Sequence, residues 1–453
     1  MNKQMKLNVK LKTLPALLVL LLALHGGPAW AMDVSDAYRQ ALAYDPSSLA
    51  ADQALEAGRE KAVQGDALLR PRVNLQASVT RLRHHSGETA SQLLSESSSG
   101  TAREATVQMV QPLYDRGATA GRRQLREQTT LAQTEFAAAR QQLALRVAEA
   151  YFGVLVAEET LRVVQAELAA VGSQHERAKA RFSVGQDRIT DVQEAQARLD
   201  GVRTREVSAQ SMLELRRAQF RETTGAAPDG LAPLSPSFAP QLPQPAALAD
   251  WQARGESRST LVLTRQSERA IANAELSKNR LASRPTIDVV ASYGAKQQSG
   301  GLSPLVAPDG ERTGAIGLVL NVPLYAGGAL DSRQREAVAR LGQADNQLAA
   351  ARRDVRLKVQ EGYLAVTTGV SRIAAQQQAL TSASSALDAT TRGRDVGSRT
   401  ALDVLDAQQR LYGAELELVQ GRADYLLGRL RLALAAGELD EDSLRSLRPW
   451  LAL

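Results

Sequence analysis

Cysteine is absent from the 453 residues of this chain. Its absence excludes disulfide bonds, thiolate metal sites and a lipid anchor on an N-terminal cysteine. The four histidines are scattered, and no nucleophile, metal-ligand or phosphate-binding motif is recognisable. The sequence therefore predicts no catalytic residues, no metal site and no cofactor.

Aromatic residues are also scarce, at 4% of the chain, while alanine, glutamine, arginine and leucine fill long segments. This composition favours long, closely packed helices over a thick globular core. The formal net charge of +6 is small for the length and includes a basic N-terminus, so it does not indicate a nucleic-acid partner.

No apolar run is long enough for a membrane-spanning helix. The short apolar run at residues 14–24 follows several lysines and precedes Ala29-Trp30-Ala31, a typical signal-peptide cleavage pattern. Residues 1–31 are therefore predicted to be a secretory signal peptide that is cleaved after Ala31. If the remaining chain enters a membrane, we expect it to do so with strands.

The remaining chain shows one order of patterns twice, which indicates an internal duplication. Each half has a helical stretch, two alternating stretches, a Pro-Leu-Tyr motif, a proline-free helix of about 65 residues and a return helix of about 40. The predicted organisation is a first structural repeat at residues 32–225, a proline-rich linker at 226–245, a second repeat at 246–437 and a short C-terminal tail at 438–453.

Alternation of apolar and polar residues predicts two strands in each half, at about residues 73–80, 104–113, 287–294 and 313–324. The polar loops between them, at roughly 84–103 and 296–312, are expected at the outer end. Four strands cannot close a membrane barrel, since the smallest have about eight. Open strand edges in lipid would leave backbone groups unpaired. Several chains must therefore pool strands; two would give eight and three would give twelve.

The helices, like the strands, require several chains to combine. The helix before the strands, at about residues 33–69 or 246–283, could stack end to end with the return helix and match the long helix in length. Each chain would then supply four helical columns as well as four strands. Pooled chains would form a membrane barrel that continues into a hollow helical cylinder.

A near-copy of one stretch stands at the end of each long helix, VGQDRITDVQEAQARL at residues 184–199 and VGSRTALDVLDAQQRL at residues 396–411. Gly185 and Gly397 occupy the second position of each copy. Glycine most readily adopts the left-handed conformation that ends a helix. Each stretch therefore predicts the bend of a helical hairpin.

Two acidic residues stand three apart just past each bend, so both carboxylates share one helix face. They are Asp191 and Glu194 in the first half, and Asp403 and Asp406 in the second. A solvated helix face would explain such a pair if it occurred once. Its recurrence at the same point of both hairpins also favours a functional role.

The sequence resembles the TolC family of outer-membrane channels over about residues 33–437. The resemblance lies in the Asp45-Pro46 motif, the twin Pro-Leu-Tyr strand ends, the twin bends and the order of all elements. It implies an α+β membrane protein: a homotrimer with a twelve-stranded β-barrel that continues into a long α-helical barrel.

The resemblance also implies a location in the Gram-negative outer membrane, with a long periplasmic extension. The implied partners are outer-membrane lipid, a periplasmic adaptor protein and an inner-membrane transporter of the ABC or RND type. The adaptor is expected to dock at the tip, at Val184, Gly185, Val396 and Gly397.

A gate is implied at the same tip. Arg399 would tie its hairpin to Thr190 and Asp191, and Asp403 and Asp406 would form acidic rings at the closed mouth. Crowded carboxylates would attract cations and resist ionisation. The alternative is that Arg399 pairs only within its own helix. One departure from the family pattern is Arg394, which replaces a tyrosine and leaves one closing link open.

The leading functional hypothesis is a passive exit duct for a protein secreted by a type I system. The Asp45-Pro46 motif resembles that of type I secretion members more than that of lipid-anchored efflux members, and the missing cysteine agrees. The alternative is a channel for efflux of drugs and other small molecules. A non-conducting surface coiled coil would explain the helices, but it leaves the paired alternating strands without a role.

Overall fold

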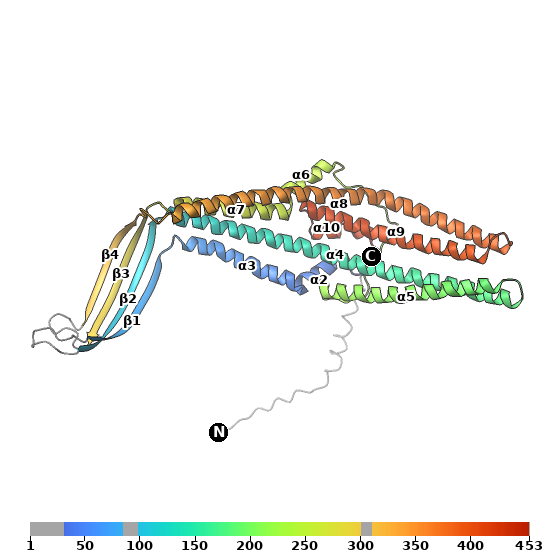
Figure 1. Ribbon diagram of the computed structural model, residues 1–453, viewed down its shortest axis with the longest axis horizontal. Coiled ribbons are helices and arrows are strands. Elements are labelled where there is room, and N and C mark those ends of the chain that lie inside the picture. The colour runs from blue at the N-terminus through green and yellow to red at the C-terminus, as the bar shows by residue number, and fades with distance from the viewer. Residues whose placement is uncertain (1–30, 85–97, 300–309, 453) are drawn as a thin grey trace, which may run out of the picture.

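This computed structural model describes residues 31–84, 98–299 and 310–452, which form a long helical body with a β-sheet at one end (Figure 1). The predicted signal peptide lies outside the described residues, apart from Ala31. The central parts of the two predicted outer loops also lie outside them.

The first half contains two short helices, two strands and two long helices. Asp45 separates the short helices: its side chain accepts hydrogen bonds from the backbone of Ser47 and Ser48, and Pro46 starts the second helix without needing a hydrogen bond. The elements are α2 (Val34–Tyr44), α3 (Pro46–Ala67), β1 (Arg72–His84), β2 (Ser98–Tyr114), α4 (Arg116–Ser183) and α5 (Ile189–Thr224).

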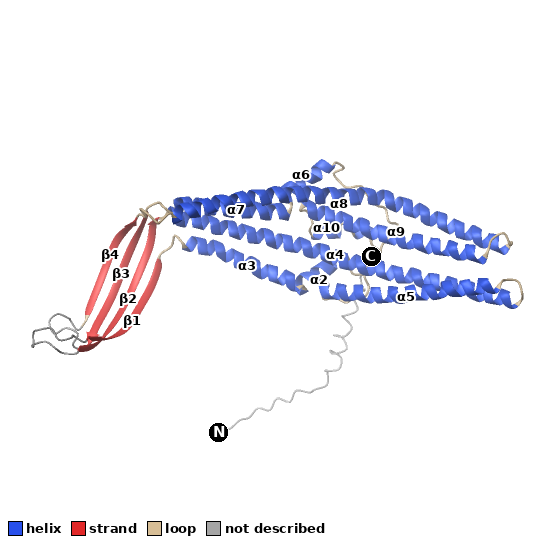
Figure 2. Ribbon diagram, viewed as in Figure 1, coloured by secondary structure: helices blue, strands red, loops and turns tan. Residues whose placement is uncertain are grey.

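The second half repeats this order (Figure 2). The helix expected at 246–283 is two helices, because the extended backbone of Ser259 interrupts it, as Asp45 does in the first half. The elements are α6 (Leu248–Arg258), α7 (Thr260–Leu281), β3 (Thr286–Ser299), β4 (Glu311–Asn321), α8 (Ala329–Asp395) and α9 (Ala401–Ala436), followed by α10 (Glu441–Arg445) and the short 3-10 helix η2 (Arg448–Trp450).

The long helices have the predicted extent. Helix α4 contains 68 residues and α8 contains 67, so each is about 100 Å long at 1.5 Å per residue. Return helices α5 and α9 end at Gly225 and Gly437, as expected, and both glycines adopt left-handed backbone angles. Helix α7 packs against both α4 and α8, and it therefore joins the two halves.

All four strands form one antiparallel sheet in the order β1-β2-β3-β4. The contact between β2 and β3 brings the two halves together, with Val107 opposite Tyr293 and Glu104 opposite Lys296. The predicted strand at 104–113 is longer and begins at Ser98, because its first residues pair with β1. Within the described chain, β1 and β4 each have a neighbouring strand on one side only.

The core lies in the middle of the helical body, where segments distant in sequence meet. Tyr151 on α4 is fully buried, and its hydroxyl is 2.9 Å from the carbonyl oxygens of both Met32 and Ala232. Burial raises the pKa of Tyr151, so this phenol stays neutral and can donate a hydrogen bond. The N-terminal segment and the linker are thereby fixed to α4.

The C-terminal tail completes this core. Trp450 is buried, and its indole nitrogen donates to the carbonyl oxygen of Ala239 in the linker at 2.8 Å. Arg448 forms an ion pair with the buried Asp33 at 2.5 Å. The predicted short tail at 438–453 is thus part of the folded body from Glu438 to Ala452.

Gly437 provides a test of this packing. Its φ is +74°, and an added Cβ would lie 2.2 Å from the carbonyl oxygen of Arg258. We expect Gly437→Ala to destabilise the protein by about 2–4 kcal/mol through left-handed strain and a backbone clash. The thermal unfolding midpoint, followed by circular dichroism, should fall by several degrees. Gly413→Ala in α9 is the control: a Cβ there meets nothing within 4 Å, and it should stabilise the helix slightly. Equal midpoints for the two variants would contradict this.

Candidate functional site

The tips of the two long hairpins lie next to one another at the end of the body farthest from the sheet (Figure 1). Gly185 and Gly397 have φ values of +77° and +80°, as the predicted bends require. Both turns close with the same pair of backbone hydrogen bonds. The glycine N–H donates to the carbonyl three residues back, Phe182 or Arg394, and the next N–H donates to the carbonyl five residues back. Val184 and Val396 are exposed at 68% and 80%.

The first acid after each bend caps its own helix. The Asp403 carboxylate accepts from the backbone and hydroxyl of Thr400 at 2.8 and 2.9 Å, and Asp191 accepts from the backbone of Arg188 at 3.0 Å. The hydrogen bonds from Thr400 hold the pKa of Asp403 below its usual range, so within the chain they oppose the resistance to ionisation that was expected. A Thr-x-x-Asp pattern before a helix is a recognisable capping signal, and it was missed in the sequence.

The second acid of the second hairpin instead joins two hairpins. Arg198 on α5 donates to the carboxylate of Asp406 and, at 2.6 Å, to the side-chain oxygen of Gln409, both on α9. Leu405 is buried beside these groups against residues of α4 and α5, including Leu199. The α4–α5 and α8–α9 hairpins of one chain are therefore in direct contact near the tip.

Arg394, the departure from the family pattern, makes a second link between the hairpins. Its guanidinium donates to the side-chain oxygen of Gln174 on α4 at 2.6 Å. It also lies 3.6 Å from the carboxylate of Asp187 in the first bend, and the side chains of Arg394 and Asp187 are 9% and 17% exposed. Burial, then the nearby charge of Arg181, lowers the pKa of Arg394. Sequence reasoning singled out this position but gave it no partner.

Of the other predicted gate residues, Arg399 and Thr190 are exposed and Asp191 is half-buried. Within the described part of one chain, no hydrogen bond or ion pair joins Arg399 to Thr190 or Asp191. The side chain of Arg399 instead lies over Gly393, close to its own bend. The contact that the resemblance implied for Arg399 stays a prediction for an assembly of several chains.

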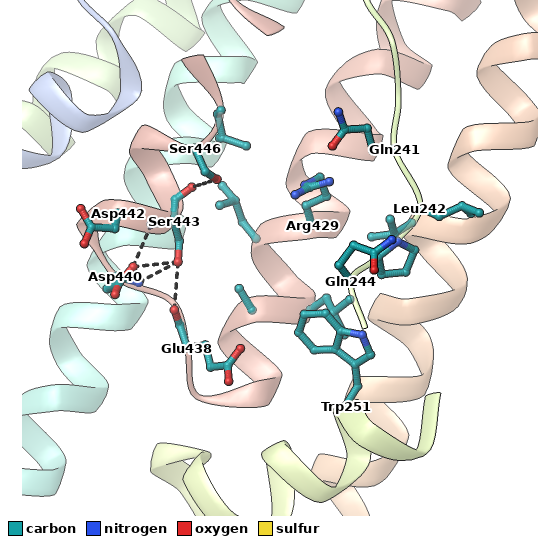
Figure 3. A pocket seen from close by; sticks show the side chains of 16 residues that line it. Gln241, Leu242, Gln244, Trp251, Arg429, Glu438, Asp440, Asp442, Ser443 and Ser446 are labelled. Carbon is teal, nitrogen blue, oxygen red and sulfur yellow. Dashed lines mark hydrogen bonds between the residues drawn. The ribbon is translucent and has the colours of Figure 1, made fainter. Parts of the chain in front are cut away.

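A cavity of about 310 Å³ lies between the linker, α9 and the tail (Figure 3). Several of its polar groups already have partners. The Ser443 hydroxyl donates to the Glu438 carbonyl at 2.9 Å, and the Glu438 carboxylate pairs with Arg254 and Arg258 at 3.2 and 2.8 Å. These contacts stabilise the junction between α9 and the tail, so we assign the cavity no binding role.

Among the described residues, no group of three or more histidine, aspartate and glutamate side chains is arranged to hold a metal ion. No helix in the described ranges combines the length and the apolar composition that crossing a membrane requires. The tip is thus the site at which the residues singled out in the sequence gather.

The long twin hairpins and the short sheet in each chain are the fold of an outer-membrane channel. The chain matches the family described as "Outer membrane efflux protein" over residues 37–226 and 256–438, and it belongs to that family. It is an outer-membrane channel protein with a periplasmic extension, and the family consists of passive channels and not of enzymes. These predictions are confirmed.

Relatives named for protein secretion and a relative named for efflux are both similar to the chain. It is 34% identical to the outer membrane protein TolC of Vibrio cholerae over 431 residues, 95% of this chain and 96% of the relative. It is 29% identical to the alkaline protease secretion protein AprF of Pseudomonas aeruginosa, covering 92% of this chain and 86% of that one. The crystal structure of the Campylobacter jejuni CmeC outer membrane channel shares the fold, with a TM-score of 0.77, 15% identity and coverage of 92% and 89%.

The link made by Arg394 can be tested without an assay of transport. Arg394→Ala leaves Gln174 and Asp187 without their partner, and a charge-assisted hydrogen bond contributes about 1.5–3 kcal/mol. Amide hydrogen exchange at residues 181–189 and 392–400 should therefore accelerate about tenfold to a hundredfold. Arg392→Ala removes an exposed arginine from the same turn of α8 and should leave exchange unchanged. Equal protection in both variants would show that Arg394 does not join the hairpins.

Proposed function

We propose that three copies of this chain form a duct across the outer membrane and the periplasm. The observation that carries this proposal is the sheet. Within the described residues its edges at β1 and β4 are unpaired, and its apolar side chains Val73, Leu75, Ile316 and Leu318 are exposed at 63–79%. The apolar face is unfavourable in water and suits lipid, whereas the open edges are costly in lipid until another chain pairs with them.

Three copies would pool twelve strands, and β4 of one copy would pair with β1 of the next. A barrel of that size closes without free edges. In the periplasmic part, α3 and α7 pack along α4 near the sheet, while α5 and α9 pair with the outer ends of α4 and α8. Each chain thus provides the four columns that a hollow helical cylinder needs, two long and two composite.

The tip is proposed as the gate. In one chain the two hairpins are joined by Arg198 with Asp406 and by Arg394 with Gln174 and Asp187. Opening would require hairpins to separate or to shift, and an adaptor docked on the exposed valines and glycines of the bends could drive this movement. Asp403 and Asp406 would lie near the constriction in each of the three copies.

We infer that the cargo is a secreted protein delivered by an ABC transporter through the adaptor. Support comes from similarity to a relative named for alkaline protease secretion. The Asp45-Pro46 motif supports this less than its sequence suggested, because Asp45 caps α3 and pairs with Arg146 at 3.0 Å, a structural role. Small-molecule efflux with an RND-type pump is the second candidate, favoured by the family description itself.

The gate can be tested by conductance in a planar lipid bilayer. Multivalent cations added on the periplasmic side should block the wild-type channel, and Asp403→Ala with Asp406→Ala should abolish the block. Because the Thr400 hydrogen bonds lower the pKa of Asp403, its carboxylate stays charged to a lower pH than that of an ordinary aspartate. The part of the block that Asp403 carries should therefore persist as the solution is made mildly acidic.

Asp395→Asn is the matched control, because it removes an exposed carboxylate of the same tip that is not one of the proposed ring residues. It should leave the block intact. A block that survives loss of both Asp403 and Asp406 would place the constriction elsewhere. Wild-type protein that inserts but carries no current would refute the duct.

A strain that lacks this gene distinguishes the two cargo classes, a secreted protein and small toxic molecules. For secretion, proteins exported without a signal peptide should disappear from the medium and reappear with the plasmid-borne gene, while drug sensitivity stays unchanged. Efflux predicts the opposite: increased sensitivity to small toxic molecules and an unchanged set of secreted proteins. As a control, the same strain is complemented with the Arg394→Ala variant, which keeps the assembly but lacks the Arg394 link between the two hairpins at the tip.

A further inference from the structure

One face of the sheet carries most of the large apolar side chains of the strands. Residues directly opposite in neighbouring strands share a face, and successive residues alternate between faces. The register places on this face one row of Val73, Met109, Ala291 and Ile316, and another that includes Leu75, Val107 and Tyr293. This is the face that meets lipid when the sheet closes into the proposed barrel.

Four arginines continue the same face toward the end farthest from the helices. In β1, Arg81 and Arg83 follow Val79 at the same alternation; Arg103 lies opposite Val79; and Arg312 lies opposite Ala295. All four are exposed. Among the described strand residues this face carries no carboxylate, so the arginines have no acidic neighbour on it.

The opposite face provides an internal comparison. At the level of Arg103, the row on that face is Ser78, Glu104, Lys296 and Glu311, so its one cation stands between two acids. The proposed lumen side therefore carries more acid than base at this height. Only the lipid side carries an uncompensated positive band.

The position of this band matches the outer boundary of the hydrocarbon layer. Tyr114 lies on the lipid face at the helix-proximal end of β2, opposite Ile287. Arg103 is about 37 Å farther along the strand at ~3.4 Å per residue, which is about 28 Å across a membrane at a tilt of about 40°. The apolar band of an outer-membrane barrel is about 25 Å tall. Tyrosine thus marks one interface and arginine the other.

We propose that Arg81, Arg83, Arg103 and Arg312 form a binding surface for the phosphorylated headgroups of the glycolipid in the outer leaflet. A guanidinium group binds phosphate through two parallel hydrogen bonds, and its weak hydration suits a membrane interface. Basic clusters at the edge of an apolar membrane surface recognise anionic headgroups. The inference rests on the proposed barrel for the orientation of the sheet, and it is independent of the cargo.

The test uses the full-length trimer purified in detergent and two probes, bisphosphorylated lipid A and the same lipid after enzymatic dephosphorylation. Binding is followed by native mass spectrometry. The wild-type trimer should bind the phosphorylated probe at least about tenfold more tightly than the dephosphorylated one. Replacing all four arginines with glutamine should remove that difference.

A control with the same change in charge replaces four exposed arginines of α8, Arg333, Arg335, Arg352 and Arg353, with glutamine. It should retain the tenfold preference. If the fourfold strand variant does not assemble, Arg81→Gln with Arg83→Gln, at the end of β1 beyond the apolar band, should reduce the preference in part.

Two results would overturn the proposal. One is equal affinity of the wild-type trimer for both probes. The other is displacement of the phosphorylated lipid by inorganic phosphate that binds as tightly as the lipid does. That result would show a site for free phosphate and not for a lipid. Trimer mass and conductance are measured on the same samples. A wild-type protein that is not a trimer, or that does not conduct, would count against the proposed duct. A conducting trimer that binds both lipid probes equally would count against the lipid surface alone.

Discussion

The backbone hydrogen bonds at the edges of the sheet constrain this protein more than any other interaction. In the described chain β1 and β4 each pair on one side, which leaves a row of N–H and C=O groups at both edges. In lipid such groups cost several kcal/mol each unless they are paired. The same sheet exposes apolar side chains that water does not favour. A chain of this kind needs copies of itself to pair with its strand edges, and the long helices continue from the sheet that those copies complete.

The middle of the helical body holds the two halves in register. The segment around Met32, the linker around Ala232 and Ala239, and the tail at Trp450 are joined to one another by hydrogen bonds to buried aromatic side chains. Long helices joined only by tight bends have little to fix how far each slides along the next. The buried tyrosine and tryptophan provide fixed points, because a polar atom buried without its partner is costly.

The tip shows how one set of acidic residues divides between two roles. Asp191 and Asp403 stabilise the starts of their helices, where an acid also interacts favourably with the helix dipole. Asp406 lies three residues later, about one turn farther along the helix, and reaches Arg198 of the other hairpin. The spacing that places two carboxylates on one face is therefore compatible with a cap and an inter-hairpin contact at once, and the sequence alone does not separate them.

The sequence by itself determined the elements of this protein. The alternation in 73–80 and 287–294, the proline-free helical stretches and the glycines at 185 and 397 depend on backbone preferences that act within a few residues. Only the tertiary structure decided where the helix expected at 246–283 is interrupted, at Ser259, and how the tail folds against the linker. It also decided the link from Arg394 to Gln174, two residues that are far apart in the chain. A local pattern records which face of a helix is apolar, but the partner of a polar side chain is set by packing across hundreds of residues.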